Sequence, residues 1–148
     1  MLDVSGYGAS LNISADKTFP QGFDVTEFAD DADPFDTPDM KIGDGKVGLN
    51  GTLITWTTAT AIIVAVSVVP NSVDDQNLSI LFEANRAGKG KFPVKDVITL
   101  TQILPNGKVD QFAPGKITDG PPGSSISSAG RIKSKTYKFM FENKSGNF

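Results

Sequence analysis

Apolar and polar residues alternate along several short stretches of the chain, which is the pattern of strands with one buried face. Leu11 and Ile13 alternate in the first stretch, and Phe23 and Val25 alternate in the second. Residues 19–22, "FPQG", carry proline and glycine in turn positions and are predicted to join the two strands. The chain is therefore expected to begin with two short strands.

The clearest strand pattern follows at residues 60–69, "TAIIVAVSVV". Both of its faces are largely apolar: Ile62, Val64, Val66 and Val68 lie on one, and Ile63, Ala65, Ser67 and Val69 on the other. A strand of this kind is covered on both sides. The second cover is expected from a helix, a second sheet or another subunit. The apolar run is too short to span a bilayer, so no membrane binding is expected.

Residues 72–88 carry the signals of the one long helix. Ser72 and, three residues later, Asp75 resemble a capping box, and Gly88 is expected just after the last turn. One face of the predicted helix consists of the apolar residues Leu78, Leu81 and Phe82, followed by the polar Asn85.

The last third of the chain returns to the strand pattern. Residues 97–104 alternate, a tight turn follows at Asn106 and Gly107, and the return strand is expected to break at Pro114. A final strand over residues 131–143 places its aromatic residues on one face, namely Tyr137, Phe139 and Phe141. These strands are predicted to form a meander.

The sequence thus predicts a mainly β protein with one helix. We expect an antiparallel β-sandwich or barrel flanked by the helix, in one domain spanning residues 1–148. Long loops are expected at about 28–46 and 119–130. Asn50–Gly51, just after the first loop, is the strongest two-residue hairpin signal. A bulge is an equal alternative there, because residues 46–50 form a weak strand.

The predicted loop at 28–46 contains a dense acidic stretch, "FADDADPFDTPDMKIGDG". A calcium loop needs a glycine at its sixth position, and none lies at the matching place. A catalytic carboxylate pair needs a fixed separation, which nothing in this stretch provides. A solvated loop is the default interpretation. An arm that orders on a partner protein is the alternative that the apolar residues Phe28, Phe35, Met40 and Ile42 favour.

Basic residues cluster at the start of the last predicted strand, in "GRIKSK". They are expected either to form a solvated edge strand or to meet the acidic stretch of a neighbouring copy, with phosphate binding as a third interpretation. The candidate contacts between subunits are Phe28, Asp30, Asp31, Asp33, Phe35, Asp36, Asp39, Met40, Arg131, Lys133 and Lys135.

Composition narrows the possible chemistry. The chain of 148 residues has a net charge of -3 and contains no cysteine and no histidine. The negative net charge argues against a dedicated nucleic-acid-binding domain. Without cysteine and histidine, the chain lacks the favoured zinc ligands, a Cys nucleophile and a His general base. "GKGK" lacks the spacing of a phosphate-binding loop. We therefore expect no enzyme activity, no cofactor and no metal. A carboxylate-dependent hydrolase and a monomeric ligand-binding β-domain are the competing hypotheses.

Four phrases of the sequence resemble the tail tube proteins of bacteriophages with contractile tails. They are "FPQGFDVTEFADDADPFDTPDMKI", "GLNGTLITW", "VVPNSVDDQNLSILFEANR" and "SSAGRIKSKTYKFMFEN". The resemblance spans most of the chain and involves whole phrases, not a catalytic signature.

The resemblance implies a virion structural protein, made in the bacterial host cytoplasm and located in the phage tail. Such subunits form hexameric rings, and the rings stack into a tube whose inner sheets fuse around a channel. Viral DNA passes through without sequence-specific binding. The implied partners are further copies of the chain, the tail sheath, the tape-measure protein and the baseplate. The alternative is another tail component: a baseplate tube-initiator, a tail terminator or a fibre-associated protein.

Overall fold

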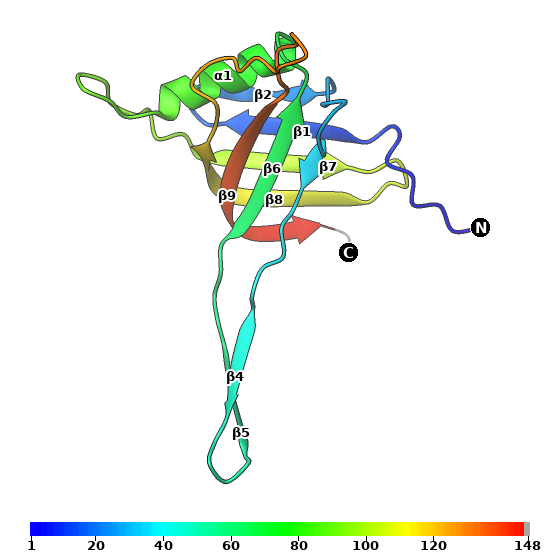
Figure 1. The fold of residues 1–148 in the computed structure, drawn as a ribbon, viewed down its shortest axis with the longest axis vertical. Helices are drawn as coiled ribbons and strands as arrows, with labels where there is room; N and C mark the ends of the chain where they lie inside the picture. Colours follow the sequence, from blue (N-terminus) through cyan, green and yellow to red (C-terminus); the bar gives the residue numbers. More distant parts are fainter. Residues whose placement is uncertain (147–148) are drawn as a thin grey trace.

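The computed structural model, which describes residues 1–146, shows a curled antiparallel sheet with a helix at one end and a long hairpin projecting from the other (Figure 1). The sheet has the strand order β2-β1-β7-β8-β9-β6-β3. Its strands are β1 (Ser10–Ala15), β2 (Phe19–Val25), β3 (Phe35–Asp36), β6 (Ile62–Val68), β7 (Ile98–Ile103), β8 (Val109–Asp119) and β9 (Lys135–Gly146). The projecting hairpin consists of β4 (Gly43–Val47) and β5 (Leu53–Thr57), and the helix is α1 (Val73–Asn85).

The long strands β8 and β9 connect two layers. The first half of β9 pairs with β6 from Val68–Lys135 to Ile62–Phe141, and its second half continues beside β8 to Gly146. Figure 1 shows β6 and the first half of β9 crossing in front of β1, β2 and β7. The prediction of a mainly β, antiparallel fold with one helix is confirmed for the described residues.

The core lies between the two layers. The aromatic face of β9 points inward as predicted, and Tyr137, Phe139 and Phe141 are buried. The buried apolar residues from the other elements are Leu11, Ile13, Ala15, Val25, Val64, Val66, Val68, Leu78, Leu81, Ile98, Leu100, Phe112 and Ile117.

The two faces of β6 differ along its length. Val64, Val66 and Val68 are buried in the core, as the alternation predicts. On the opposite face Ser67 is buried and its hydroxyl is 2.8 Å from that of Thr136, whereas Ile63 is 41% exposed. Cover on both sides is therefore confirmed only for the part of β6 nearest to α1.

The predicted helix start is correct and the predicted end is not. Ser72 caps α1, and its hydroxyl accepts a hydrogen bond from the Asp75 amide at 3.2 Å. Gly88 does not follow the last turn, because Arg86 already has extended backbone and ends the helix. Lys91, in the next turn of the chain, donates from its ammonium to the carbonyls of Glu83 and Arg86 and satisfies the helix terminus instead.

Two predictions about prolines are wrong. Residues 19–22 belong to β2, and the turn before it comes at residues 16–18. Pro20 is tolerated there because β2 is an edge strand that leaves some backbone N–H groups without partners. Pro114 does not break β8, because the register with β7 shifts between Phe112 and Gly115 and removes the need for its missing N–H.

The two predicted long loops differ in the structure. The range 28–46 contains β3 and β4, so it is more regular than predicted. Asn50–Gly51 lies in the turn between β4 and β5, which makes the hairpin interpretation right and the bulge wrong. Residues 120–134 contain no named strand and are held by local hydrogen bonds and an isolated bridge between Ile126 and Ile132.

Replacing Leu81 with alanine is expected to lower the free energy of unfolding by about 2–5 kcal/mol, because the substitution opens a cavity in the core under α1. Chemical denaturation of the purified protein measures this change. Ile80→Ala is the matched control, since Ile80 neighbours it on the same helix but is 53% exposed. An equal loss in both variants would contradict the packing described above.

Candidate functional site

The β4–β5 hairpin is the most exposed element of the protein. All ten residues of its two strands are exposed, although they pair in regular register from Gly43–Thr57 to Val47–Leu53. Its turn closes through a hydrogen bond from the Gly51 amide to the Gly48 carbonyl at 2.9 Å, with Gly51 at a φ of +83°. An isolated two-stranded hairpin is at best marginally stable in water. The hairpin is therefore expected to gain cover from another molecule.

Apolar side chains lie on both faces of this hairpin. Paired residues of an antiparallel ladder share a face, so Trp56 and Ile54 lie on one face with Asp44 and Lys46. Leu53, paired with Val47, lies on the other. The exposed large apolar residues of the hairpin and its base are Met40, Ile42, Val47, Leu49, Leu53, Ile54 and Trp56. A projecting apolar element of this size is typical of an interaction surface.

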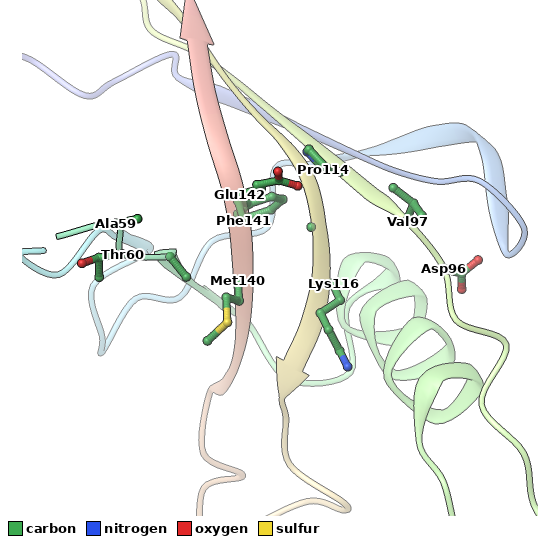
Figure 2. Close-up of a pocket in the computed structure, with 11 residues that line it drawn as sticks. Ala59, Thr60, Asp96, Val97, Pro114, Lys116, Met140, Phe141 and Glu142 are labelled. Carbon is green, nitrogen blue, oxygen red and sulfur yellow. The ribbon is translucent and has the colours of Figure 1, made fainter.

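A groove of about 610 Å³ lies at the base of the hairpin (Figure 2). Its lining combines Ala59, Thr60 and Ala61 from the hairpin base with residues that precede β7 and residues of β8 and β9. Met140, Pro114 and Val97 supply apolar surface, and Lys116 and Glu142 add one charge of each sign. The groove is thus continuous with the exposed hairpin and shares its mixture of apolar and oppositely charged groups.

Asp96, at the edge of this groove, joins three parts of the chain. Its carboxylate accepts hydrogen bonds from the amides of Lys17 and Thr18, both at 3.0 Å, and from the Asn85 side chain at 2.9 Å. The Thr18 hydroxyl donates to the same carboxylate. Burial by itself raises the pKa of Asp96, but the hydrogen bonds from Thr18, Asn85 and Lys17 outweigh it and hold the pKa below the ordinary value of 3.8.

The acidic stretch is an ordered strap along β6. Arg131 forms a two-point ion pair with Asp30 at 2.7 and 3.1 Å, and the Ser134 hydroxyl donates to Asp31. The hydrogen bonds from Arg131 lower the pKa of Asp30. Phe35 packs against the core in β3, with its ring 6.5 Å from that of Phe112. The acid–base pairing expected between copies thus occurs at Asp30 and Arg131 within one chain.

The other candidate contact residues take different positions. Phe28 is partly buried against the core and bridges to Val68, whereas Asp33, Asp36 and Asp39 are exposed and Met40 is 41% exposed. Lys133 is exposed. That these residues contact another subunit stays a prediction.

Lys135 instead points toward a buried polar cluster. Its ammonium lies 3.3 Å from the Asp75 carboxylate, which also accepts hydrogen bonds from the Tyr137 hydroxyl and the Asn71 amide, both at 3.0 Å. The Ser79 and Tyr137 hydroxyls are 2.7 Å apart. Burial and the nearby Asp75 charge raise the pKa of Tyr137. This cluster anchors α1 to β9, so Lys135 has a structural role within the chain.

Within residues 1–146 the main sheet is open at β2, along the end of β9 and at the two-residue strand β3, which pairs with β6 alone. β2 pairs with β1 alone. At the other side of the same layer, β9 extends past the end of β6 at Phe141, and beyond that point it borders β8 as its one neighbouring strand. Open strand edges are templates for pairing with another chain.

The contact residues predicted from the sequence include none in β4 or β5, and the open strand edges were not identified. The Asn50–Gly51 signal followed by the apolar residues 53–56 was the available indication of the hairpin. The described part of the chain contains no acidic, cysteine or histidine cluster suited to holding a metal ion. It also contains no helix long and apolar enough to cross a membrane.

The fold defines the class of this protein as mainly β, with a curled antiparallel sheet, one helix and a projecting hairpin. The family model described as "Tail fiber protein gp32" matches residues 2–145, and the chain belongs to this family. It is therefore a phage-tail-like protein. Comparison with curated proteins gave no significant relative.

Three solved structures share the fold at low sequence identity. A chain of the anti-feeding prophage baseplate, 6-fold symmetrised, aligns over 99% of this chain and 97% of its own with a TM-score of 0.58 and 8% identity. A chain of the anti-feeding prophage tube-terminating cap aligns over 99% and 92%, with a TM-score of 0.57 and 11% identity. A chain of the sheath/tube terminator structure of the extracellular contractile injection system PVC, in the extended state, aligns over 100% and 99%, also with 0.57 and 11%.

Replacing Asp96 with asparagine is expected to lower the free energy of unfolding near pH 7 by about 1–3 kcal/mol, because the amide keeps one acceptor oxygen and the donors on the other carboxylate oxygen lose theirs. The folded-state pKa of Asp96 is lowered, so its contribution is complete above the unfolded-state pKa and is lost as pH falls below it.

Urea denaturation from pH 7 down to about pH 3 tests both parts, and the Asp96→Asn variant should lose less stability on acidification than the parent protein. Asp33→Asn, at an exposed acid, is the control. Parallel curves for the Asp96→Asn variant and the parent would show that the carboxylate does not contribute in this way.

Proposed function

We propose that this protein is a structural subunit that assembles with further copies of itself into a ring on the axis of a contractile tail. The observation that carries the proposal is the β4–β5 hairpin, whose two partly apolar faces have no cover from the rest of the described chain. A surface of this kind is stable when it is buried in an assembly. Membership of a tail protein family supports the same function.

The open edges supply the geometry for ring closure. The edge of β2 and the end of β9 lie on opposite sides of one layer, so they present different surfaces. Pairing β2 of one copy with the end of β9 of the next is a head-to-tail contact, and repeating it around an axis closes a ring. Ring closure removes both edges, which otherwise promote aggregation.

The three solved relatives favour a ring at an end of the tube. Their descriptions name a baseplate, a tube-terminating cap and a sheath/tube terminator. We therefore place the subunit first at a tube end, as a baseplate tube-initiator or a terminator. The second candidate is the repeating subunit of the tube itself. The hairpin favours it, because it projects along the molecule's long axis, opposite α1, and is able to reach a neighbouring ring (Figure 1).

The remaining parts of the proposal come from the resemblance to tail tube proteins. The ring is hexameric, lies in the virion tail and contacts the baseplate, the sheath or the tape-measure protein, with DNA passing through. The subunit is not an enzyme. The support is membership of a tail protein family, together with a sequence that has no histidine base and no cysteine nucleophile.

Negative-stain imaging of the purified protein at rising concentration tests this function. Isolated rings would support the tube-end position, and long stacks of rings would support the repeating tube. A protein that stays monomeric alone and also when added to tail particles lacking it would refute the ring and favour a ligand-binding domain.

Replacing Trp56 with threonine is expected to prevent assembly while changing the free energy of unfolding by less than about 0.5 kcal/mol, because the side chain is 50% exposed on the hairpin. Threonine keeps the strand propensity of the site. Sedimentation velocity and denaturation of the same sample measure the two effects, with Ile80→Ala as the control for loss of an exposed apolar side chain. If the Trp56→Thr variant forms normal rings, the Trp56 side chain does not contribute to the interface between subunits.

The exposed acids of the strap allow a separate test of charge. We expect the triple substitution D33N, D36N and D39N to keep the fold, because Asp30 still binds Arg131 and Phe35 still packs on the core. Ring association should weaken and become less sensitive to salt if these carboxylates meet Lys133 of a neighbour. Association constants at low and high salt give the answer, and an unchanged salt dependence would argue against the contact.

A further inference from the structure

One face of the sheet is almost free of charge. Residues that pair across an antiparallel sheet share a face, so each register row can be followed from strand to strand. One row runs across five strands through Asp24, Asn12, Thr101, Gln111 and Ser145. This row alternates with the core rows, so its side chains lie on the side away from the core.

The neighbouring rows have the same character. Ser14 pairs with Thr99, Ala113 pairs with Asn143, and Ser10, Ile103 and Val109 form the row on the other side. We call this surface the neutral face: Ser10, Asn12, Ser14, Asp24, Thr99, Thr101, Ile103, Val109, Gln111, Ala113, Asn143 and Ser145.

The neutral face contains no lysine or arginine, although the whole chain has 14 of them. Asp24, at the edge strand, is its one ionisable residue and accepts a hydrogen bond from Asn12 at 2.9 Å. The outer surface of the other layer differs, because Lys116, Lys138 and Glu142 lie there. Soluble proteins usually intersperse charges over about a quarter to a third of their surface residues, so the contrast between the two layers is informative.

We propose that the neutral face lines the channel of the ring and forms a wall to which a passing polyanion, duplex DNA, does not adhere. This inference rests on the ring proposed above and assigns the surface that meets the translocated polymer. The chemistry of the face fits that partner. Affinity for duplex DNA without sequence preference comes from lysine and arginine on phosphate, and the face has neither. It also lacks aromatic side chains on which exposed bases stack.

The space available around the ring axis indicates which side of the subunit faces the channel. Copies arranged in a ring have least room nearest the axis. The layer of β2, β1, β7, β8 and the end of β9 is a single sheet thick and carries the open edges of β2 and of the end of β9. The second layer, α1 and the hairpin all lie on other sides of the molecule (Figure 1). Placing the neutral face inward puts the thin layer where room is least and the bulk where room is greatest.

Single cysteines test the placement, since the chain contains no cysteine of its own. Thr101→Cys marks the neutral face, and Ser128→Cys in an exposed loop is the control. Each is treated, before and after assembly, with a small maleimide and with a maleimide on a polymer too large to enter the channel. We expect assembly to protect the Thr101→Cys variant from the large reagent alone, by about tenfold or more relative to the control.

Equal reaction of the two variants in assembled rings would overturn the inference and leave the ring intact. Failure of every variant and of the parent protein to form rings would overturn the proposed function and, with it, this inference. The two failures are distinguished by imaging the labelled samples.

A charge substitution tests the chemistry. Assembled rings of the parent protein should not retain short duplex DNA at low salt, whereas the Thr101→Lys variant should retain it in a salt-sensitive manner, about tenfold more strongly. Thr101→Gln is the neutral control of similar size and should behave as the parent does. Retention of DNA by parent rings, or equal retention by all three proteins, would show that the neutral face is not an inert wall.

Discussion

The structure depends on one strand that serves two layers. β9 places Tyr137, Phe139 and Phe141 in the core while its backbone pairs with β6 and then continues beside β8 alone. Because the aromatic side chains fill the space between the layers, the sheet curls and does not stay flat. The same strand carries Lys135, whose pairing with Asp75 ties α1 to the sheet. A change in the register of β9 would therefore disturb the core, the helix and the open edge together.

The core is packed and buried within one chain, whereas the hairpin and the open strand edges have no cover from the rest of the described residues. Residues of the core satisfy one another, and buried carboxylates such as Asp75 and Asp96 have several hydrogen-bond donors. The β4–β5 hairpin and the edge of β2 have no such completion within the described chain. This division fits the proposed ring, since assembly would then add contacts without rearranging the core.

Some charged side chains pair within the chain and others are left exposed. The strap holds an ion pair between Asp30 and Arg131 inside the chain, while its other acids stay exposed. The outer surface of one layer carries both signs of charge, and that of the other is nearly neutral. In an assembly around a channel, these surfaces would meet different neighbours: the exposed acids another subunit, and the neutral face the polymer that passes.

The elements whose signals are local could be predicted from the order of residues alone. Alternation within residues 60–69 and 97–104 predicted β6 and β7, it also predicted the inward face of β9, and the Ser72 cap predicted the start of α1, because period and capping act over a few residues. Contacts in the folded chain establish which edges stay open, that Arg131 meets Asp30 from 101 residues away, and that the range 28–46 forms a strap and a hairpin strand. Those outcomes depend on contacts between distant segments, to which local patterns give no access.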